Sequence, residues 1–169
     1  MKKNLVLLGM MGVGKTTLGK IVAKNQDLQF IDTDFNIEKN NLMTIAEIFE
    51  KKGENFFRIE EKTEVLKSLK KNNCVIALGG GAFINKVIRK SILNNAVSIW
   101  LDINIKTINK RVKWNNKRPL LNNSDNEKKL VKLYKERKKI YELANYKIKC
   151  DDLSKNDIIK KIEAIYENN

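Results

Sequence analysis

The sequence predicts an α/β protein, a three-layer sandwich whose five-stranded parallel central sheet carries helices on both faces. Short apolar segments alternate with longer amphipathic segments along the whole chain, a pattern typical of strands joined by crossover helices. The strand candidates are continuous apolar runs, such as Leu5 to Leu8 and Val75 to Leu78. Such runs are expected where helices cover both faces of a parallel sheet.

The predicted elements follow from apolar periodicity and from capping residues. Strands are expected at residues 4–8, 30–32, 74–78, 96–101 and 146–150. Helices are expected at residues 17–25, 35–40, 44–52, 55–71, 86–93, 105–112, 127–144 and 154–166. Thr44 and Glu47 have the spacing of a capping box, Ser154 is expected to cap the last helix, and Gly53 is expected to break the helical run. Without internal repeats or linkers, residues 1–169 are expected to form a single domain.

Composition excludes several function classes. The chain has no histidine, which excludes a histidine general base, a histidine-activated nucleophile and most zinc sites. The formal net charge of +14 makes nucleic-acid binding one interpretation. The lysines are scattered, however, and no run of five basic residues occurs. This favours a lysine-rich surface that attracts small anionic substrates, with no nucleic-acid partner.

Cysteine usage and hydropathy bear on location. Cys74 and Cys150 are far apart and form no C-x-x-C motif, so they are interpreted as small buried apolar residues in a reducing compartment. No secretory signal is recognisable, and no run approaches the roughly 18 apolar residues that a membrane span needs. A cytoplasmic protein without a membrane partner is therefore expected.

The most informative motif lies between the first strand and the first helix. The run Gly9-Met10-Met11-Gly12-Val13-Gly14-Lys15-Thr16 fits the phosphate-binding pattern G-x-x-x-x-G-K-[ST]. Its backbone N–H groups and the helix N-terminus would surround phosphate oxygens. Lys15 would reach the β- and γ-phosphates and the Thr16 hydroxyl would bind Mg²⁺. The alternative is a glycine-rich turn that binds no ligand.

Two further loops are expected at the same edge of the sheet, because parallel strands end there together. Asp32-Thr33-Asp34 follows the second strand, and Gly79-Gly80-Gly81 follows the third. One carboxylate could hold Mg²⁺ through water and the other could accept a proton from an acceptor hydroxyl. The alternatives are a pair of helix-capping aspartates and a flexible turn.

Arginine is used sparingly. Only five of the 34 Lys and Arg residues are arginine: Arg58, Arg89, Arg111, Arg118 and Arg137. A planar guanidinium suits carboxylates and phosphates better than an ammonium does. Glu61 is placed to form an ion pair with Arg58. Arg118, which precedes the only proline, is a candidate arginine finger. The alternative interpretation is that Arg118 is an exposed charge in a loop.

Taken together, these motifs resemble the shikimate kinase family. The motifs are D-T-D at Asp32 to Asp34, F-F-R ending at Arg58, the Gly79 to Gly81 triplet, R-P-L-L from Arg118, and Arg137 with Tyr141. The resemblance runs from Leu5 to about Tyr166. It implies a P-loop NTPase fold of the nucleoside-monophosphate-kinase type, with substrate-binding helices at about 33–61 and a lid at about 112–125.

The resemblance also implies roles for individual residues. ATP would be bound by Gly12, Val13, Gly14, Lys15, Thr16, Thr17, Arg111 and Arg118, and Mg²⁺ by Thr16 and Asp32. Shikimate would be bound by Asp34, Phe49, Phe57, Arg58, Gly80, Gly81 and Arg137. The catalytic residues would be Asp34, Lys15 and Arg118. The implied reaction is transfer of the ATP γ-phosphoryl group to the shikimate 3-hydroxyl, by a monomer.

Three other functions are compatible with parts of this pattern. Another small P-loop kinase, acting on gluconate or a nucleotide, shares the phosphate-binding loop, and gluconate shares the carboxylate. A basic nucleic-acid-binding P-loop protein would explain the charge, and its affinity would fall steeply with salt. A regulatory nucleotide-binding module without turnover would not need Asp34 as an acceptor base.

Overall fold

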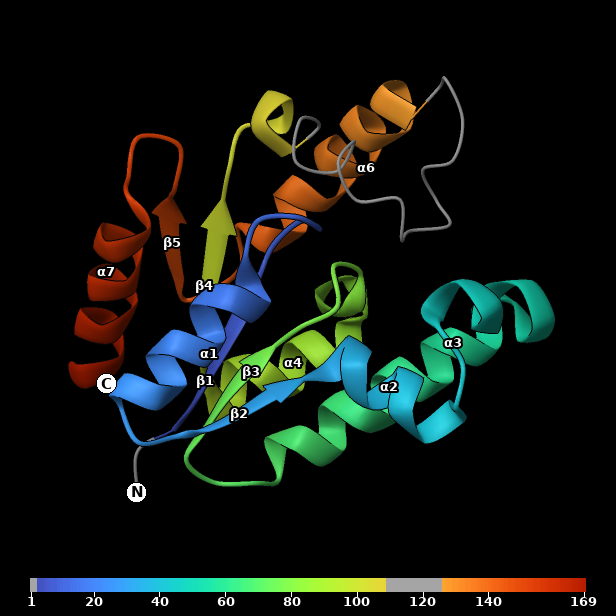
Figure 1. Cartoon of the computed structure of the whole chain (residues 1–169), viewed down its shortest axis with the longest axis horizontal. Helices are drawn as coiled ribbons and strands as arrows, with labels where there is room; N and C mark the ends of the chain where they lie inside the picture. The colour runs from blue at the N-terminus through green and yellow to red at the C-terminus, as the bar shows by residue number, and fades with distance from the viewer. Residues whose placement is uncertain (1–2, 109–125) are drawn as a thin grey trace.

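A computed structural model describes residues 3–108 and 126–169 of the chain (Figure 1). Within them, five parallel strands form one sheet in the order β2-β3-β1-β4-β5. The strands are β1 (Asn4–Leu8), β2 (Gln29–Asp32), β3 (Cys74–Ala77), β4 (Ala96–Asp102) and β5 (Tyr146–Lys149). The predicted parallel sheet is confirmed.

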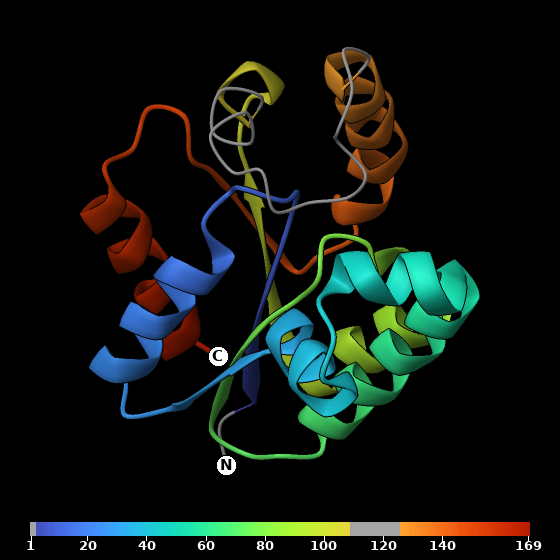
Figure 2. The ribbon, with the colours of Figure 1, turned by 45° about the vertical axis from the view of Figure 1, so that its right-hand side comes forward.

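Helices cover both faces of this sheet. They are α1 (Lys15–Asn25), α2 (Thr33–Asn41), α3 (Ile45–Leu69), the short η1 (Ala82–Ile84), α4 (Lys86–Asn95), α6 (Asn126–Tyr141) and α7 (Lys155–Glu167). Figure 2 shows α1 and α7 together on one side of the sheet, and α3 and α4 on the other. In the described part of the chain, no helix is both long and apolar enough to cross a membrane.

Local capping chemistry explains where several helices begin. Thr44 and Glu47 form the predicted capping box of α3, and Ser154 with Asp157 forms that of α7. Helix α2 begins at Thr33, two residues before the predicted start, because the Asp32 side chain caps it. The predicted break at Gly53 is present as a residue with φ 83° and ψ 168°, which interrupts α3 without separating its two halves.

Other boundaries differ from the prediction by a few residues. Helix α1 begins at Lys15 and not at residue 17, directly after the phosphate-binding glycine, and α6 ends at Tyr141 and not at residue 144. Residues 105–108 are helical, as predicted. The rest of the predicted 105–112 helix and the whole predicted lid at 112–125 lie outside the described residues.

The apolar residues form two separate clusters. The large one packs the sheet between its helices and includes the fully buried Trp100 and Tyr141. The small one, formed around Ile37, Ile48 and Phe57, lies between α2 and α3. Burying one such side chain contributes roughly 1.5–3 kcal/mol. The helices at 33–61 therefore have a core of their own beside the sheet edge.

The topology also determines where a ligand can sit. Strands β1 and β3 are neighbours in the sheet, yet α1 and α4, which follow them, lie on opposite faces (Figure 2). Such a switch point opens a crevice at the carboxyl ends of the two strands. The phosphate-binding loop leaves β1 there, and the Gly79 to Gly81 loop leaves β3.

Candidate active site

The phosphate-binding loop joins β1 to α1 in the conformation that an anion site needs. Gly14 has φ 102°, a left-handed conformation that glycine adopts at low cost, and α1 begins at the next residue. The Lys15 ammonium donates hydrogen bonds to the carbonyls of Gly9 and Met10, both at 2.9 Å. The helix N-terminus and the lysine therefore lie at the mouth of the loop, where phosphate oxygens bind.

A pair of oxygen ligands lies beside this loop. The Thr16 hydroxyl donates to Asp32 Oδ2 at 2.6 Å, while Asp32 Oδ1 accepts a hydrogen bond from the Phe35 N–H at 3.2 Å. Asp32 therefore caps α2 and also faces the phosphate loop, so the capping alternative and the functional one are compatible for this residue. Hard oxygen donors of this kind fit Mg²⁺, which keeps several waters and needs few protein ligands.

Thr33 connects the acidic loop with the glycine loop. Its buried hydroxyl accepts a hydrogen bond from the Gly79 N–H at 3.0 Å and donates to the Ala77 carbonyl at 3.3 Å. No role was predicted for Thr33, although its place between the two aspartates was a usable signal. This threonine holds the start of the glycine loop against the end of β2.

Two carboxylates converge on Gly79. A Cβ atom built on Gly79 would lie 2.4 Å from Asp34 Oδ1 and 3.1 Å from Glu61 Oε1. Asp34 Oδ1 is shielded from solvent, and Glu61 is 2% exposed. Burial raises the pKa of Glu61, Arg58 opposes this effect, and the nearby charge of Asp34 adds to it. The missing side chain of Gly79 therefore leaves the space that both carboxylates occupy.

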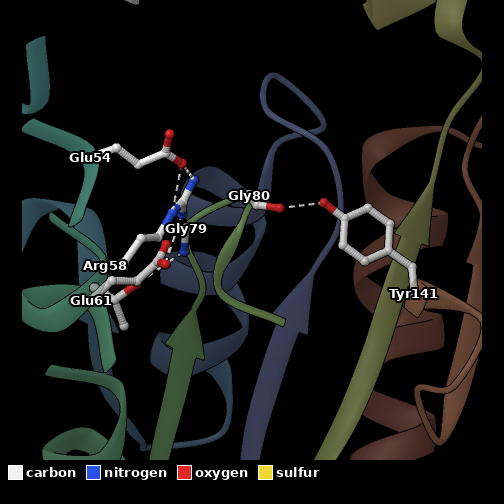
Figure 3. A network of polar contacts seen from close by, with 7 residues as sticks. Glu54, Arg58, Glu61, Gly79, Gly80 and Tyr141 are labelled. Carbon is white, nitrogen blue, oxygen red and sulfur yellow. Dashed lines mark hydrogen bonds and ion pairs between the residues drawn. The ribbon is translucent and has the colours of Figure 1, made fainter. Parts of the chain in front are cut away.

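Arg58 is held between two glutamates of its own helix (Figure 3). Its Nη1 donates to Glu61 Oε2 at 2.8 Å, so the predicted Arg58–Glu61 ion pair is confirmed. Its Nε and Nη2 both donate to Glu54 Oε1, at 3.2 and 3.0 Å. The contact with Glu54 was not predicted, although the i,i+4 spacing of Glu54 and Arg58 could have indicated it. Burial lowers the pKa of Arg58, but the two carboxylates outweigh this and raise it.

The glycine loop lies between the two predicted substrate arginines. A Cβ atom on Gly81 would lie 2.6 Å from Arg58 Nη1, and one on Gly80 would lie 3.4 Å from Arg137 Nη1. Arg137 comes from α6 and is 9% exposed. The same Gly80 position lies 3.5 Å from the Met11 backbone nitrogen. The phosphate loop, the glycine loop and both guanidinium groups therefore meet at the crevice.

These groups enclose a cavity of about 320 Å³, the size of a small-molecule site. All seven residues predicted to bind the acceptor line it: Asp34, Phe49, Phe57, Arg58, Gly80, Gly81 and Arg137. Six further lining residues were not predicted to bind the acceptor, although Asp32 was predicted to bind Mg²⁺ and Glu61 to pair with Arg58: Met11, Asp32, Phe35, Glu38, Ile45 and Glu61. The rings of Phe49 and Phe57, 4.9 Å apart, form an apolar wall opposite the charged groups. The cavity therefore suits a small ring that carries a carboxylate.

In the described part of the chain, the cavity does not include the residues that are predicted to bind ATP. Val13 is buried in the loop, whereas Gly12 and Thr17 are exposed at its surface. Arg111 and Arg118 lie outside the described residues, so their predicted contacts with adenine and the γ-phosphate stay predictions. Within the described residues, no group of three or more acidic or cysteine side chains forms a metal cluster.

A phosphate-binding loop that faces a carboxylate-lined and arginine-lined cavity defines the class of P-loop kinases of small molecules. Comparison with known proteins narrows this class. The family model described as shikimate kinase matches residues 11–166. A shikimate kinase from Thermoanaerobacter pseudethanolicus is 40% identical over 97% of this chain and 96% of its own length. The chain therefore belongs to the shikimate kinase family.

Solved structures agree with this assignment. A shikimate kinase from Acinetobacter baumannii in complex with shikimate superposes with a TM-score of 0.94 at 33% identity, covering 100% of this chain and 96% of that one. A gluconokinase from Sinorhizobium meliloti has a TM-score of 0.62 at 13% identity, covering 99% and 93% of the two chains. The second likeness shows the shared P-loop kinase fold alone.

Proposed function

We propose that this chain transfers the γ-phosphoryl group of ATP to the 3-hydroxyl of shikimate, giving shikimate 3-phosphate and ADP in aromatic amino-acid biosynthesis. The observation that carries the proposal is the convergence of Arg58, Arg137 and Asp34 in one cavity beside the phosphate-binding loop. Family membership and the similarity to a shikimate-bound relative support it.

The two arginines would hold the acceptor by its carboxylate. Arg58 and Arg137 come from different helices, α3 and α6, and lie on either side of the glycine loop. Charge-assisted hydrogen bonds from two planar guanidinium groups hold a carboxylate in position as well as neutralising it. The ring would then lie against Phe49 and Phe57, and the Gly80 and Gly81 N–H groups would face its oxygens.

Asp34 would accept the proton of the attacking hydroxyl. In the transfer, the hydroxyl oxygen forms a bond to the γ-phosphorus while the bond from that phosphorus to the bridging oxygen of ADP breaks. The hydroxyl proton passes to the Asp34 carboxylate, and ADP leaves with the bonding electrons. Little covalent chemistry is left for the protein, so positioning and charge stabilisation provide most of the catalysis.

Lys15 and the N-terminus of α1 would stabilise the phosphates of ATP. Thr16 and Asp32 are the residues that would hold Mg²⁺, directly or through water. The ion, when bound, neutralises charge on the phosphate oxygens. The predicted lid would exclude water from the site, which suppresses hydrolysis of ATP.

The proposal is tested by measuring ADP release from purified protein with ATP and Mg²⁺. Shikimate, shikimate methyl ester, gluconate and a panel of nucleoside monophosphates are compared as acceptors. We expect rapid release with shikimate and weak release with the ester, which lacks the carboxylate that the arginines bind. Faster release with gluconate or a nucleotide, or none with any acceptor, would reject the proposal.

We also expect a monomer in the cytoplasm with no nucleic-acid partner. The monomer is tested by size-exclusion chromatography with light scattering. Salt-dependent binding to duplex DNA would instead favour the basic nucleic-acid-binding alternative.

A further inference from the structure

One polar group beside the cavity has no place in the function proposed above. Tyr141, the last residue of α6, is 1% exposed, and its ring packs 5.9 Å from that of Trp100. Its hydroxyl donates a hydrogen bond to the carbonyl of Gly80 (Figure 3). The side chain therefore reaches from α6 to the backbone of the glycine loop.

This hydrogen bond orients the peptide group between Gly80 and Gly81. The described residues contain no cis peptide bonds, and in a planar trans peptide the C=O and N–H groups point in opposite directions. Because the Gly80 carbonyl points at Tyr141, the Gly81 N–H points away from Tyr141. Figure 3 shows Tyr141 and Arg58 on opposite sides of Gly80. Gly81 is one of the residues that line the cavity.

Two of the three N–H groups of this loop are available to a ligand. Among the hydrogen bonds of the described residues, the N–H groups of Gly80 and Gly81 donate to no acceptor, whereas that of Gly79 donates to Thr33. Glycine has the greatest backbone freedom, so a glycine triplet needs contacts from outside to keep one conformation. Thr33 supplies such a contact at the start of the loop, and Tyr141 supplies one at its centre.

Arg137 lies one helical turn before Tyr141 on α6, and its Nη1 would lie 3.4 Å from a Cβ atom built on Gly80. Burial raises the pKa of Tyr141, while the charge of Arg137 and a hydrogen bond from it act in the opposite direction; the net effect is a raised pKa. The phenol therefore keeps its proton at neutral pH and donates a hydrogen bond to the Gly80 carbonyl. The Tyr141 hydroxyl and the Arg137 guanidinium thus both lie beside Gly80.

We propose that Tyr141 is a positioning residue for the acceptor acid: its hydroxyl fixes the Gly80–Gly81 peptide, beside which the Arg137 guanidinium lies, in the orientation that binds the substrate. The proposal rests on the function proposed above and adds a residue that would not touch the substrate. The Tyr141 hydroxyl contacts the phosphate-binding loop only weakly among the described residues, at 3.9 Å from the Met10 sulfur. We therefore expect an effect on the affinity for the acid and none on the affinity for ATP.

The test compares Tyr141→Phe with Tyr134→Phe. Tyr134 is a matched control, since it also lies on α6 and its hydroxyl also donates one hydrogen bond, to Asp102 at 2.9 Å. The difference is the acceptor: Gly80 lines the cavity, whereas Asp102 does not. We expect Tyr141→Phe to raise the dissociation constant of shikimate about threefold to tenfold, the effect of one lost hydrogen bond. The dissociation constant of ATP should be unchanged, and Tyr134→Phe should leave both at the wild-type value.

Calorimetry at one temperature gives both constants, and the melting temperature of each variant reports its folding. An unchanged shikimate affinity in folded Tyr141→Phe would overturn the proposal, as would an equal loss of affinity for ATP and shikimate. If wild-type protein itself does not bind shikimate, the proposed function fails instead. These two failures are therefore distinguishable.

A second measurement on the wild-type chain keeps the proposal testable if Tyr141→Phe folds poorly. The four tyrosines are labelled with ¹³C at Cζ, and the signals of Tyr134, Tyr146 and Tyr166 are assigned with their Phe variants. We expect the remaining signal, that of Tyr141, to shift when shikimate is added, and that of Tyr134 to stay in place. A Tyr141 signal that does not respond to shikimate would contradict the proposal.

Discussion

Replacing Gly79 with alanine tests the position of Asp34 without changing any functional group. The new Cβ would lie 2.4 Å from Asp34 Oδ1, and real contacts of this kind are essentially never closer than 3.0 Å. The carboxylate must therefore retreat by about 0.6 Å or more. Since a misplacement of roughly 1 Å can cost about 10²-fold in rate, we expect kcat to fall about tenfold to hundredfold. The strain should also lower the free energy of unfolding by about 1–3 kcal/mol.

Gly80→Ala is the matched control, because it adds the same methyl group one residue later. Its Cβ would meet Arg137 Nη1 at 3.4 Å and the Met11 nitrogen at 3.5 Å, which are ordinary contacts. Steady-state kinetics with saturating ATP and shikimate should give a strongly reduced kcat for Gly79→Ala. Gly80→Ala should keep a kcat near that of wild type and raise the shikimate KM instead, because Gly80 lines the acceptor cavity. A Gly79→Ala enzyme with kcat within twofold of wild type would refute the assigned position and role of Asp34.

Three further substitutions test separate parts of the site. Asp34→Asn should lower kcat by about 10²-fold or more, because the proton acceptor is lost, with an unchanged dissociation constant for ATP by calorimetry. Arg58→Ala should raise the shikimate KM about tenfold to hundredfold, since a charge-assisted contact to the carboxylate is lost. Glu61→Gln should remove the part of the pH dependence of the free energy of unfolding that comes from Glu61, because glutamine does not titrate. The raised pKa of Glu61 means that wild-type stability falls as pH rises above about 4.5, through the folded-state pKa.

Each of these expectations can fail in a defined way. Near wild-type turnover by Asp34→Asn would show that the carboxylate is structural, and an unchanged KM in Arg58→Ala would show the same for the arginine. For Glu61, urea unfolding is measured between pH 4 and 7 for both proteins. The stability of wild type relative to Glu61→Gln should decrease as pH rises. An increase would mean that Arg58 lowers the pKa of Glu61 below its ordinary value.

The features that the sequence predicted well depend on local chemistry. The five parallel strands follow from continuous apolar runs such as β1 and β3, and the caps at Thr44 and Ser154 follow from hydrogen bonds that span three residues. The convergence of the loops after β1, β2 and β3 follows from the parallel direction of the strands. The Arg58–Glu61 ion pair was also accessible, because residues three apart meet on one helix face.

What the sequence did not reveal depends on contacts between distant segments. The space that Gly79 leaves for Asp34 and Glu61 arises only when β3 and α3 are packed together. The hydrogen bond from Tyr141 to Gly80 joins residues 61 positions apart, and the one from Gly79 to Thr33 joins residues 46 apart. No local periodicity or capping pattern encodes such pairings. Helix α2 began earlier than predicted because the aspartate interpreted as a ligand is also its cap.

The central claim is that a guanidinium group from α3 and one from α6 hold an acid whose hydroxyl faces Asp34. A crystal structure with shikimate, ADP and Mg²⁺ bound tests it most directly. The account predicts that the shikimate carboxylate lies within hydrogen-bonding distance of Arg58 and Arg137, with the 3-hydroxyl beside Asp34 and directed toward the β-phosphate. A carboxylate bound away from both arginines, or a 3-hydroxyl turned away from the nucleotide, would contradict it.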